Sequence, residues 1–297
     1  MKRSFALIMI ILAAMFWGTT GTMQALAPET AHPISIGAIR LAVGGLFLLT
    51  IVLVSGKLNL DNWPIKTTIL AAVSMALYQP FFFSAVLMTG VAIGTVVAIG
   101  SAPIFTGFIE WIFLKKRPAG LWWISTSLSI LGCIILLMNQ ESVYINPIGI
   151  VLALGAGASF ASYTFVSREM VRNHSPLSVV AVVFTLSAIL LSPLLFMFDM
   201  SWVTSIRGLG VSLHLGIIAT GIAYLLFAKG LSSVPSSTAV TLSLAEPLTA
   251  TLLGVIVVGE RLNALSWVGI SLLLLGIVIL IWSSNRAGNR KIKKYRL

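Results

Sequence analysis

The sequence predicts an all-α integral membrane protein with ten transmembrane helices, arranged as two inverted five-helix repeats. Charged residues make up 9% of the 297 residues and hydrophobic residues 58%, and the mean hydropathy is +1.03. A soluble domain usually carries about a quarter charged residues, because its surface faces water. The apolar stretches are continuous, only short polar loops separate them, and each approaches the about 20 residues that a spanning helix needs.

The expected spans divide evenly between the two halves of the chain. In the first half they cover residues 5–27, 33–54, 66–87, 92–113 and 120–138. In the second half they cover residues 148–166, 176–197, 208–228, 236–258 and 264–282. The first stretch, with Lys2-Arg3 before it and Ala25-Leu26-Ala27 near its end, also resembles a cleavable signal peptide. Its full-span length and its place in the repeat favour a helix that is retained.

The basic residues predict the orientation. If the spans alternate, all Lys and Arg residues lie on the side of the N-terminus except Arg207 and Arg261, on the other side, and Arg40, within a span. This bias follows the positive-inside rule and places both termini in the cytoplasm, in a bacterial plasma (inner) membrane. It also accounts for the net charge of +11 without nucleic acid as a partner. We expect the basic tail, residues 286–297, to contact anionic lipid.

The two halves align at an offset of about 144 residues. The matched segments are Ala14-Met15-Phe16 with Ala158-Ser159-Phe160, Pro33 with Pro176, Ser101-Ala102-Pro103 with Ala245-Glu246-Pro247, and Lys116-Arg117 with Glu260-Arg261. Five helices is an odd number, so the second repeat must enter the membrane from the opposite side. We therefore expect a first repeat over residues 1–141 and a second over 142–285. Inverted repeats are typical of transporters, with the substrate site between the halves.

Several of these residues make the chain resemble the EamA-type transporters of the drug/metabolite transporter superfamily. The likeness lies in Phe16-Trp17-Gly18, in Arg40, and in the run from Leu244-Ala245-Glu246-Pro247 through Gly259-Glu260-Arg261-Leu262 to Gly269 and Gly276. The first repeat has Lys115-Lys116 where the family usually has Gly-Glu. The resemblance implies ten helices, a cavity that alternates between the two sides, and export of small metabolites, often amino acids. It also implies that the fifth and tenth helices lie away from the path.

Ionisable residues inside the expected spans are candidates for function, because burying a charge in a bilayer is costly. Glu246 lies about ten residues into its span, near midplane at ~1.5 Å per residue. Pro247 follows it and lacks an N–H, which would free a carbonyl one turn earlier. The Glu246 carboxylate could bind a proton or a substrate amine. The alternative is that it is a structural acid paired with Arg40. Arg40 could receive a substrate carboxylate, or form a helix–helix salt bridge or snorkel.

Two further ionisable residues have weaker claims. Glu110 lies near the cytoplasmic end of its span, where a gate or an interfacial salt bridge is expected rather than substrate contact. His214 lies early in the eighth span, where a lone His is weak support for proton coupling.

Amphipathic side chains within the spans predict where substrate would bind. Trp17, Gly21 and Gln24 share one face of the first helix. Tyr78 and Gln79 lie at the middle of the third helix, Tyr163 in the sixth and Tyr224 in the eighth. We expect these side chains to line a cavity for an aromatic or amphipathic metabolite, with ordinary core packing as the alternative. The prolines Pro80, Pro103 and Pro247 are the expected hinges.

The sequence does not support an enzyme. It lacks a Gly-x-x-x-x-Gly-Lys-Ser/Thr loop for ATP and a His, Cys and carboxylate cluster with metal-ligand spacing. An intramembrane hydrolase would need a Ser/His or paired-Asp arrangement, and no Asp lies within an expected span. The lone Cys133 excludes an intrachain disulfide. We expect neither a cofactor nor a metal.

The predicted function is secondary transport, namely export of amino acids or related metabolites by alternating access. A lipid-carrier flippase or a passive small-molecule channel is the alternative, although a channel would not need paired repeats with hinge prolines. The expected partners are a small-molecule substrate and the lipid bilayer, and the protein would be a monomer or a homodimer.

Overall fold

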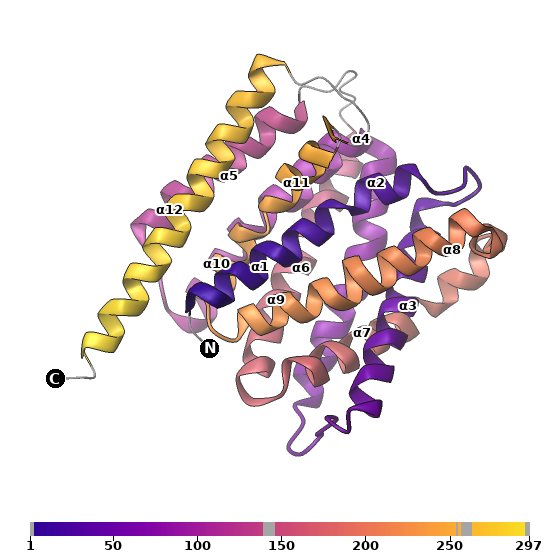
Figure 1. Ribbon diagram of the computed structural model, residues 1–297, viewed down its shortest axis with the longest axis horizontal. Coiled ribbons are helices and arrows are strands. Elements are labelled where there is room, and N and C mark those ends of the chain that lie inside the picture. Colours follow the sequence, from indigo (N-terminus) through magenta and orange to yellow (C-terminus); the bar gives the residue numbers. More distant parts are fainter. Residues whose placement is uncertain (1–2, 139–145, 254, 257–262, 295–297) are drawn as a thin grey trace.

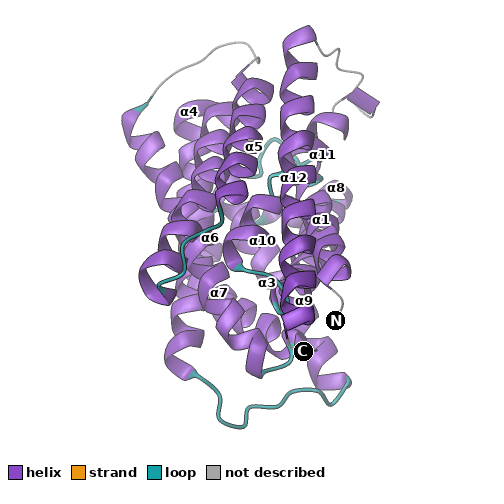
Figure 2. Cartoon of the chain, turned by 90° about the vertical axis from the view of Figure 1, so that its left-hand side faces the viewer, coloured by secondary structure: helices purple, strands orange, loops and turns teal. Residues whose placement is uncertain are grey.

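The fold is a bundle of helices (Figure 1). A computed structural model describes residues 3–138, 146–253, 255–256 and 263–294, and this part of the chain contains no strand. Eight helical segments are long and apolar enough to cross a membrane, and Gly120–Leu136 is a shorter apolar helix. The protein is therefore a multi-pass membrane protein. Figure 2 shows the described chain as helices joined by loops.

The helices follow the expected spans closely. In the first half they are α1 (Arg3–Gly18), α2 (Thr20–Ala25), α3 (Pro33–Val54), α4 (Ile65–Leu114) and α5 (Gly120–Met138). In the second half they are α6 (Pro147–Asn173), α7 (Pro176–Met197), α8 (Ile206–Leu213), α9 (Ala223–Leu231), α10 (Ser236–Leu242), α11 (Ala245–Leu253) and α12 (Ala264–Lys294). A 3₁₀ turn covers Ser201–Thr204, and a π-helical stretch over His214–Ile222 joins α8 to α9.

Proline sets the start of three helices. Pro33, Pro147 and Pro176 occupy the first position of α3, α6 and α7. The proline ring has the φ angle that a helix requires, and the missing N–H would have no partner there. Asn146 also caps α6, because its side chain accepts hydrogen bonds from the backbone N of Ile148 and Gly149.

Glycine separates two of the expected spans. The third and fourth spans lie in α4, whose backbone leaves the helical region at Gly90, with φ 81° and ψ 162°. A residue with a Cβ rarely adopts this conformation. Pro80 and Pro103 lie inside α4, where the backbone stays helical. The hinge role of these two prolines stays a prediction.

The expected ninth span is interrupted. A single helix over 236–258 was expected, but α10 ends at Leu242 and α11 begins at Ala245. Pro247 has no N–H to donate to Ser243, and the backbone N of Glu246 donates to the Ser243 carbonyl instead, at 2.9 Å. The expectation that Pro247 frees the carbonyl one turn earlier is therefore wrong. The motif Gly259-Glu260-Arg261-Leu262 and the repeat boundary at 141/142 lie outside the described residues, as does the end of the basic tail.

Helices of the two halves pack against each other. The main contacts join α3 to α7, α5 to α12, α1 to α9 and α4 to α6. Figure 1 shows α5 and α12 together at one edge of the bundle. They approach closely because Gly132 faces Gly269: a Cβ added at Gly132 would lie 2.6 Å from the Gly269 carbonyl oxygen. Small residues at such crossings are how membrane helices pack.

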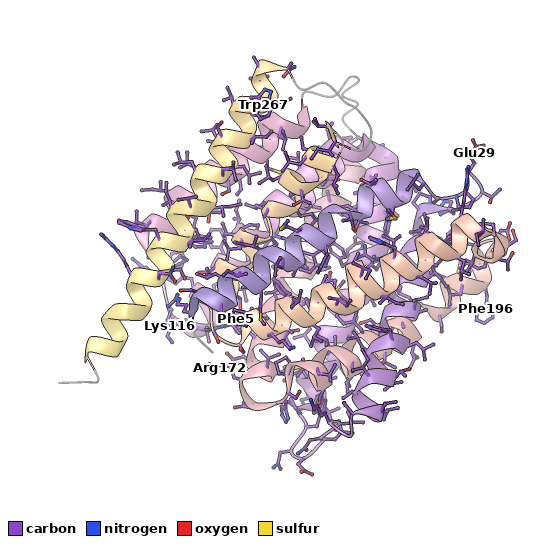
Figure 3. The ribbon with its side chains drawn as sticks, in the orientation of Figure 1. Phe5, Glu29, Lys116, Arg172, Phe196 and Trp267 are labelled. Atoms are coloured by element: carbon purple, nitrogen blue, oxygen red, sulfur yellow. The ribbon has the colours of Figure 1, made fainter. Side chains whose placement is uncertain are left out.

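The start of α1 and the end of α12 lie at the same end of the bundle. The Nε of Arg3 donates a 2.9 Å hydrogen bond to the hydroxyl of Ser284. Many large apolar side chains point outward, among them Phe5, Phe196 and Trp267 (Figure 3), which are 52%, 89% and 55% exposed. Such a surface is suited to lipid rather than water.

Candidate functional site

Aromatic side chains from four helices meet inside the bundle. Trp17 of α1 lies against Tyr224 of α9, with ring centroids 4.7 Å apart, and contacts Phe160 of α6 edge-on at 5.7 Å. Tyr78 of α4 lies 5.9 Å from the same Phe160. Tyr163 lies 5.8 Å from Tyr224. The structure therefore brings together the four aromatic residues that the sequence singled out, around Phe160.

These aromatic residues differ in exposure. Tyr163 and Tyr224 are buried, at 1% and 3% exposure, and Trp17 at 4%. Tyr78 is only half-buried. Tyr163 is also packed edge-on against Phe184 of α7. Tyr163 is therefore a core residue in this conformation, whereas Tyr78 has accessible surface that a substrate could contact.

Glu246 lies in the first turn of α11, directly after the interruption of the helix. It lies deep in the protein but keeps part of its surface accessible. Gly18 of α1 allows this close approach, because a Cβ there would lie 2.8 Å from the Glu246 carbonyl oxygen and 2.6 Å from Thr249 Cβ. The Trp17-Gly18 pair thus places an aromatic ring and the turn that carries the carboxylate next to each other.

Arg40 of α3 carries the opposite charge. It is 6% exposed, and its Nε donates a 3.2 Å hydrogen bond to the hydroxyl of Thr220 in the π-helical stretch. The ion pairs that the described residues form are Arg168–Glu110 and Arg172–Glu169. Arg40 and Glu246 form no direct salt bridge, so the structural pairing considered for Glu246 does not form in this conformation. The two residues belong to the same region of the bundle, because α1 contacts both the π-helical stretch that holds Arg40 and α11, which carries Glu246.

Several polar atoms in this region are buried without a partner. Gln79 is 2% exposed, and within the described chain neither its Oε1 nor its Nε2 has a hydrogen-bond partner. Its Cβ lies 3.4 Å from where a Cβ of Gly37 would stand, one turn before Arg40 on α3. Trp17 Nε1 and Gln24 Nε2 also have no partner among these residues. Burying such groups unpaired costs about 1–3 kcal/mol each, so these atoms are available to bond to a substrate.

Comparison with known proteins identifies the family. The sequence model of the EamA-like transporter family matches residues 4–138 and again residues 147–282. The chain belongs to the EamA-like transporter family. It is 54% identical to the uncharacterized transporter YwfM of Bacillus subtilis (strain 168) over 280 residues, which cover 94% of this chain and 95% of that protein.

Other relatives are more distant. The threonine/homoserine exporter RhtA of Escherichia coli (strain K12) is 28% identical over 276 residues, covering 92% of this chain and 88% of that protein. A crystal structure at 20% identity superposes with a TM-score of 0.82 and covers 95% of this chain and 98% of that one, which shows a shared fold.

As a member of the EamA-like transporter family, the protein is a membrane transporter and not an enzyme. Among its described residues, no three His, Cys, Asp or Glu side chains group as metal ligands would.

Glu110 forms the interfacial salt bridge that its position predicted. Its carboxylate accepts hydrogen bonds from the backbone N of Ser236 at 2.7 Å and from the Ser237 hydroxyl at 2.5 Å, and lies 3.9 Å from Arg168 Nη1. It therefore joins α4 to the start of α10 and to α6. Sequence reasoning did not find these partners, and a Ser-Ser pair after Pro235 was the available signal, since such residues begin helices.

His214 joins the two halves at another point of the bundle. Its Nε2 lies 2.8 Å from the Thr19 hydroxyl, at the junction of α1 and α2. Its role in proton coupling stays a prediction.

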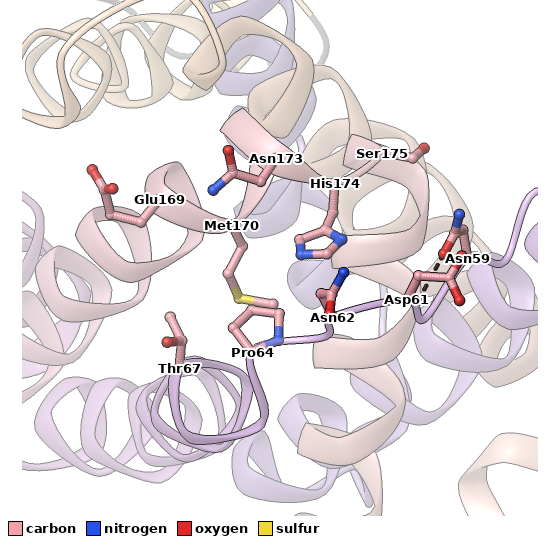
Figure 4. A pocket seen from close by; sticks show the side chains of 10 residues that line it. All are labelled: Asn59, Asp61, Asn62, Pro64, Thr67, Glu169, Met170, Asn173, His174 and Ser175. Carbon is pink, nitrogen blue, oxygen red and sulfur yellow. Dashed lines mark hydrogen bonds between the residues drawn. The ribbon is translucent and has the colours of Figure 1, made fainter.

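A cavity of about 750 Å³ lies outside this cluster, where the loop before α4 faces the turn between α6 and α7. Figure 4 shows its mostly polar lining, which includes Asn59, Asp61, Glu169 and His174. None of the residues predicted to bind substrate lines it. Its position beyond the ends of the apolar helices fits a water-filled recess at the membrane surface.

Proposed function

We propose that this protein is a secondary exporter of amino acids or related amphipathic metabolites. It would move them across a bacterial inner membrane by alternating access. The observation that carries the proposal is the pair Arg40 and Glu246. The two residues come from opposite halves of the chain and form no direct salt bridge. Arg40 is held by Thr220 of the π-helical stretch and Glu246 lies in α11, and α1 contacts both of these segments.

An amino acid zwitterion fits this arrangement. The terminal nitrogens of Arg40 can receive a carboxylate in bidentate geometry, while the Glu246 carboxylate can receive an ammonium group. Trp17, Tyr78 and Tyr224 would then pack against the substrate side chain. The resemblance to RhtA, a threonine/homoserine exporter, supports an amino acid as substrate. Glu246 can instead bind a proton when the substrate is absent, because desolvation of a buried carboxyl favours its neutral form.

We further propose that the ten spans form two inverted repeats, residues 1–141 and 142–285, with α5 as the fifth span and the interrupted α10–α11 segment as the ninth. A pseudo-twofold axis between the repeats would place α3 against α7 and α5 against α12, because these helices have the same position in their repeats. It would also relate the contact of α1 with α9 to the contact of α6 with α4. All four contacts occur. The second match of the family model also supports two repeats.

The orientation follows from charge. The start of α1 and the end of α12 share one end of the bundle, where Lys116 and Arg168 also lie. By the positive-inside rule we place this end in the cytoplasm.

Transport by purified protein in liposomes tests the function. Vesicles loaded with unlabelled threonine or phenylalanine should accumulate the labelled amino acid from outside by counterflow, and a pH gradient should change the net flux. A passive channel would give flux without counterflow, and a flippase would move lipid but neither amino acid. Absence of counterflow for every amino acid tested, in protein that is folded and inserted, would overturn the proposal.

A further inference from the structure

A second cavity, of about 260 Å³, lies at the end of the bundle that holds both chain termini. Six helices contribute to its lining: the start of α1, the end of α4, the start of α5, the side of α6, the start of α10 and the second half of α12. Figure 3 shows Lys116 beside the start of α1, close to Phe5. The cavity is separate from the Arg40–Glu246 site, and it shares no residue with the proposed substrate cluster.

The lining of this cavity is strongly cationic. Four basic side chains, Arg3, Lys116, Arg117 and Arg168, face a single acid, Glu110. Lys115 ends α4 in a left-handed conformation, with φ 53°, and this turn directs the two residues that follow it toward the cavity.

The one acid is already engaged. Both oxygens of Glu110 accept hydrogen bonds from the start of α10, and its nearest cation, Arg168, lies at 3.9 Å. Its single negative charge cannot balance four positive ones. Arg3 and Arg168 also repel each other electrostatically. Four positive charges gathered at one cavity attract anions, although Lys116 and Arg117 are exposed to solvent.

The two arginines are positioned to bind an anion. The Nε of Arg3 donates to the Ser284 hydroxyl at 2.9 Å, and the Nε of Arg168 donates to the Val234 carbonyl at 2.7 Å. These hydrogen bonds fix each guanidinium by its Nε. Within the described chain they leave the terminal nitrogens of Arg3 and one terminal nitrogen of Arg168 without a hydrogen bond or ion pair, and both side chains line the shared cavity. Fixed guanidinium groups bind phosphate in this way.

The surroundings of the cavity are those of the membrane interface. Trp111 and Trp282 are 38% and 48% exposed, and each ring carries a guanidinium, with Arg117 Cζ 5.0 Å and Arg286 Cζ 3.7 Å from the ring centroids. Exposed tryptophans mark the headgroup level of a bilayer. Leu114 and Leu280 form apolar walls of the cavity, and Phe113, next to it on α4, is 70% exposed.

We propose that this cavity binds the phosphate headgroup of an anionic phospholipid, whose acyl chains lie along the exposed apolar surface of α4. Basic pockets between transmembrane helices on the cytoplasmic side commonly bind such headgroups. The single negative charge of the headgroup would reduce the excess positive charge of Arg3, Lys116, Arg117 and Arg168, and the lipid would connect the ends of helices from both halves of the chain. The binding does not depend on which substrate the protein transports.

Native mass spectrometry of the purified full-length protein, exchanged into mixed phosphatidylglycerol and phosphatidylcholine, tests the proposal. Wild-type protein should retain one phosphatidylglycerol in preference to phosphatidylcholine. The double variant Lys116→Gln, Arg117→Gln should bind phosphatidylglycerol about thirty-fold more weakly. Each basic residue near the membrane surface contributes about 1 kcal/mol, so the loss of each lowers the affinity roughly fivefold. The matched control Lys57→Gln, Lys66→Gln removes two exposed lysines elsewhere and should bind like wild type. Equal retention by both double variants would overturn the proposal.

Two further arms define the ligand and guard against misfolding. Glycerol phosphate and inorganic phosphate should displace the lipid only weakly; if either binds as tightly as phosphatidylglycerol, the site takes a small anion and the lipid assignment is wrong. The charge-preserving variant Lys116→Arg, Arg117→Lys should retain the lipid. In wild-type protein, retention should fall as salt rises, and retention independent of salt would contradict an electrostatic site.

Discussion

The carboxylate of Glu110 on α4 accepts a 2.7 Å hydrogen bond from the backbone N of Ser236, the first residue of α10. These residues are 126 positions apart and belong to opposite halves of the chain. The bond satisfies a backbone donor at a helix start, where no intrahelical acceptor is available. The same carboxylate binds the Ser237 hydroxyl and faces Arg168. This contact joins the two halves of the chain at one end of the bundle.

Removing the Glu110 carboxylate should make that end of the bundle more accessible to solvent. Glu110→Ala leaves the Ser236 N–H unpaired and Arg168 without its acid, and hydrogen bonds to a charged group contribute about 1.5–3 kcal/mol. We expect a cysteine introduced at Thr238, with Cys133 replaced by Ser, to react with a membrane-impermeant maleimide at least tenfold faster in this variant. Cys133 is the lone cysteine of the chain, so after its replacement the introduced cysteine is the one thiol that can react. Equal labelling rates with and without the carboxylate would contradict this role.

Neutralising Glu246 should impair transport without impairing folding. Glu246→Gln keeps the shape of the side chain and removes the charge that would bind a substrate amine or a proton. Loss of one charge-assisted interaction of about 2 kcal/mol predicts a roughly thirty-fold lower transport rate. Counterflow in liposomes measures it. Glu29→Gln is the matched control, since Glu29 lies in an exposed loop (Figure 3) and should leave transport unchanged. Wild-type rates for Glu246→Gln would show that the residue is structural.

The Arg40 side chain should set the affinity for the substrate carboxylate. Arg40→Lys keeps the positive charge but loses the bidentate fork, so we expect the half-saturating substrate concentration to rise about tenfold with less change in the maximal rate. Thr220→Val removes the hydroxyl that holds Arg40 Nε and should raise the same concentration a few-fold. If Thr220→Val behaves as wild type while Arg40→Lys is impaired, the hydrogen bond does not position Arg40.

The close approach of α1 to α11 should depend on Gly18. A Cβ at this position would lie 2.6 Å from Thr249 Cβ and 2.8 Å from the Glu246 carbonyl oxygen. Gly18→Ala therefore requires a backbone shift, and overpacking of this kind costs about 1–3 kcal/mol. We expect a lower melting temperature in detergent and slower transport. Gly21→Ala is the control in the same segment, because a Cβ there meets nothing within 4 Å. Similar melting temperatures for the two variants would refute the tight crossing.

The positions of the spans were predictable from the sequence because hydropathy is a local property. A run such as Pro33–Val54 is apolar whichever helix lies beside it, and the starts at Pro147 and Pro176 follow from the chemistry of proline. The candidate charges Arg40, Glu110 and Glu246 were also found from the sequence, since an ionisable residue in an apolar run is costly wherever its neighbours lie.

Only the tertiary structure decided the interruption at Ser243–Leu244, the partners of Glu110, and the separation of Arg40 from Glu246. The last two depend on contacts between residues far apart in the chain: Arg40 with Thr220 across 180 positions, and Glu110 with Ser236 across 126. Hydropathy says that a segment faces away from water but not which neighbour it meets. In a bilayer the helices have no hydrophobic drive to associate, so packing of small residues such as Gly18 and Gly132 selects the neighbours, and that selection is a property of the assembled bundle.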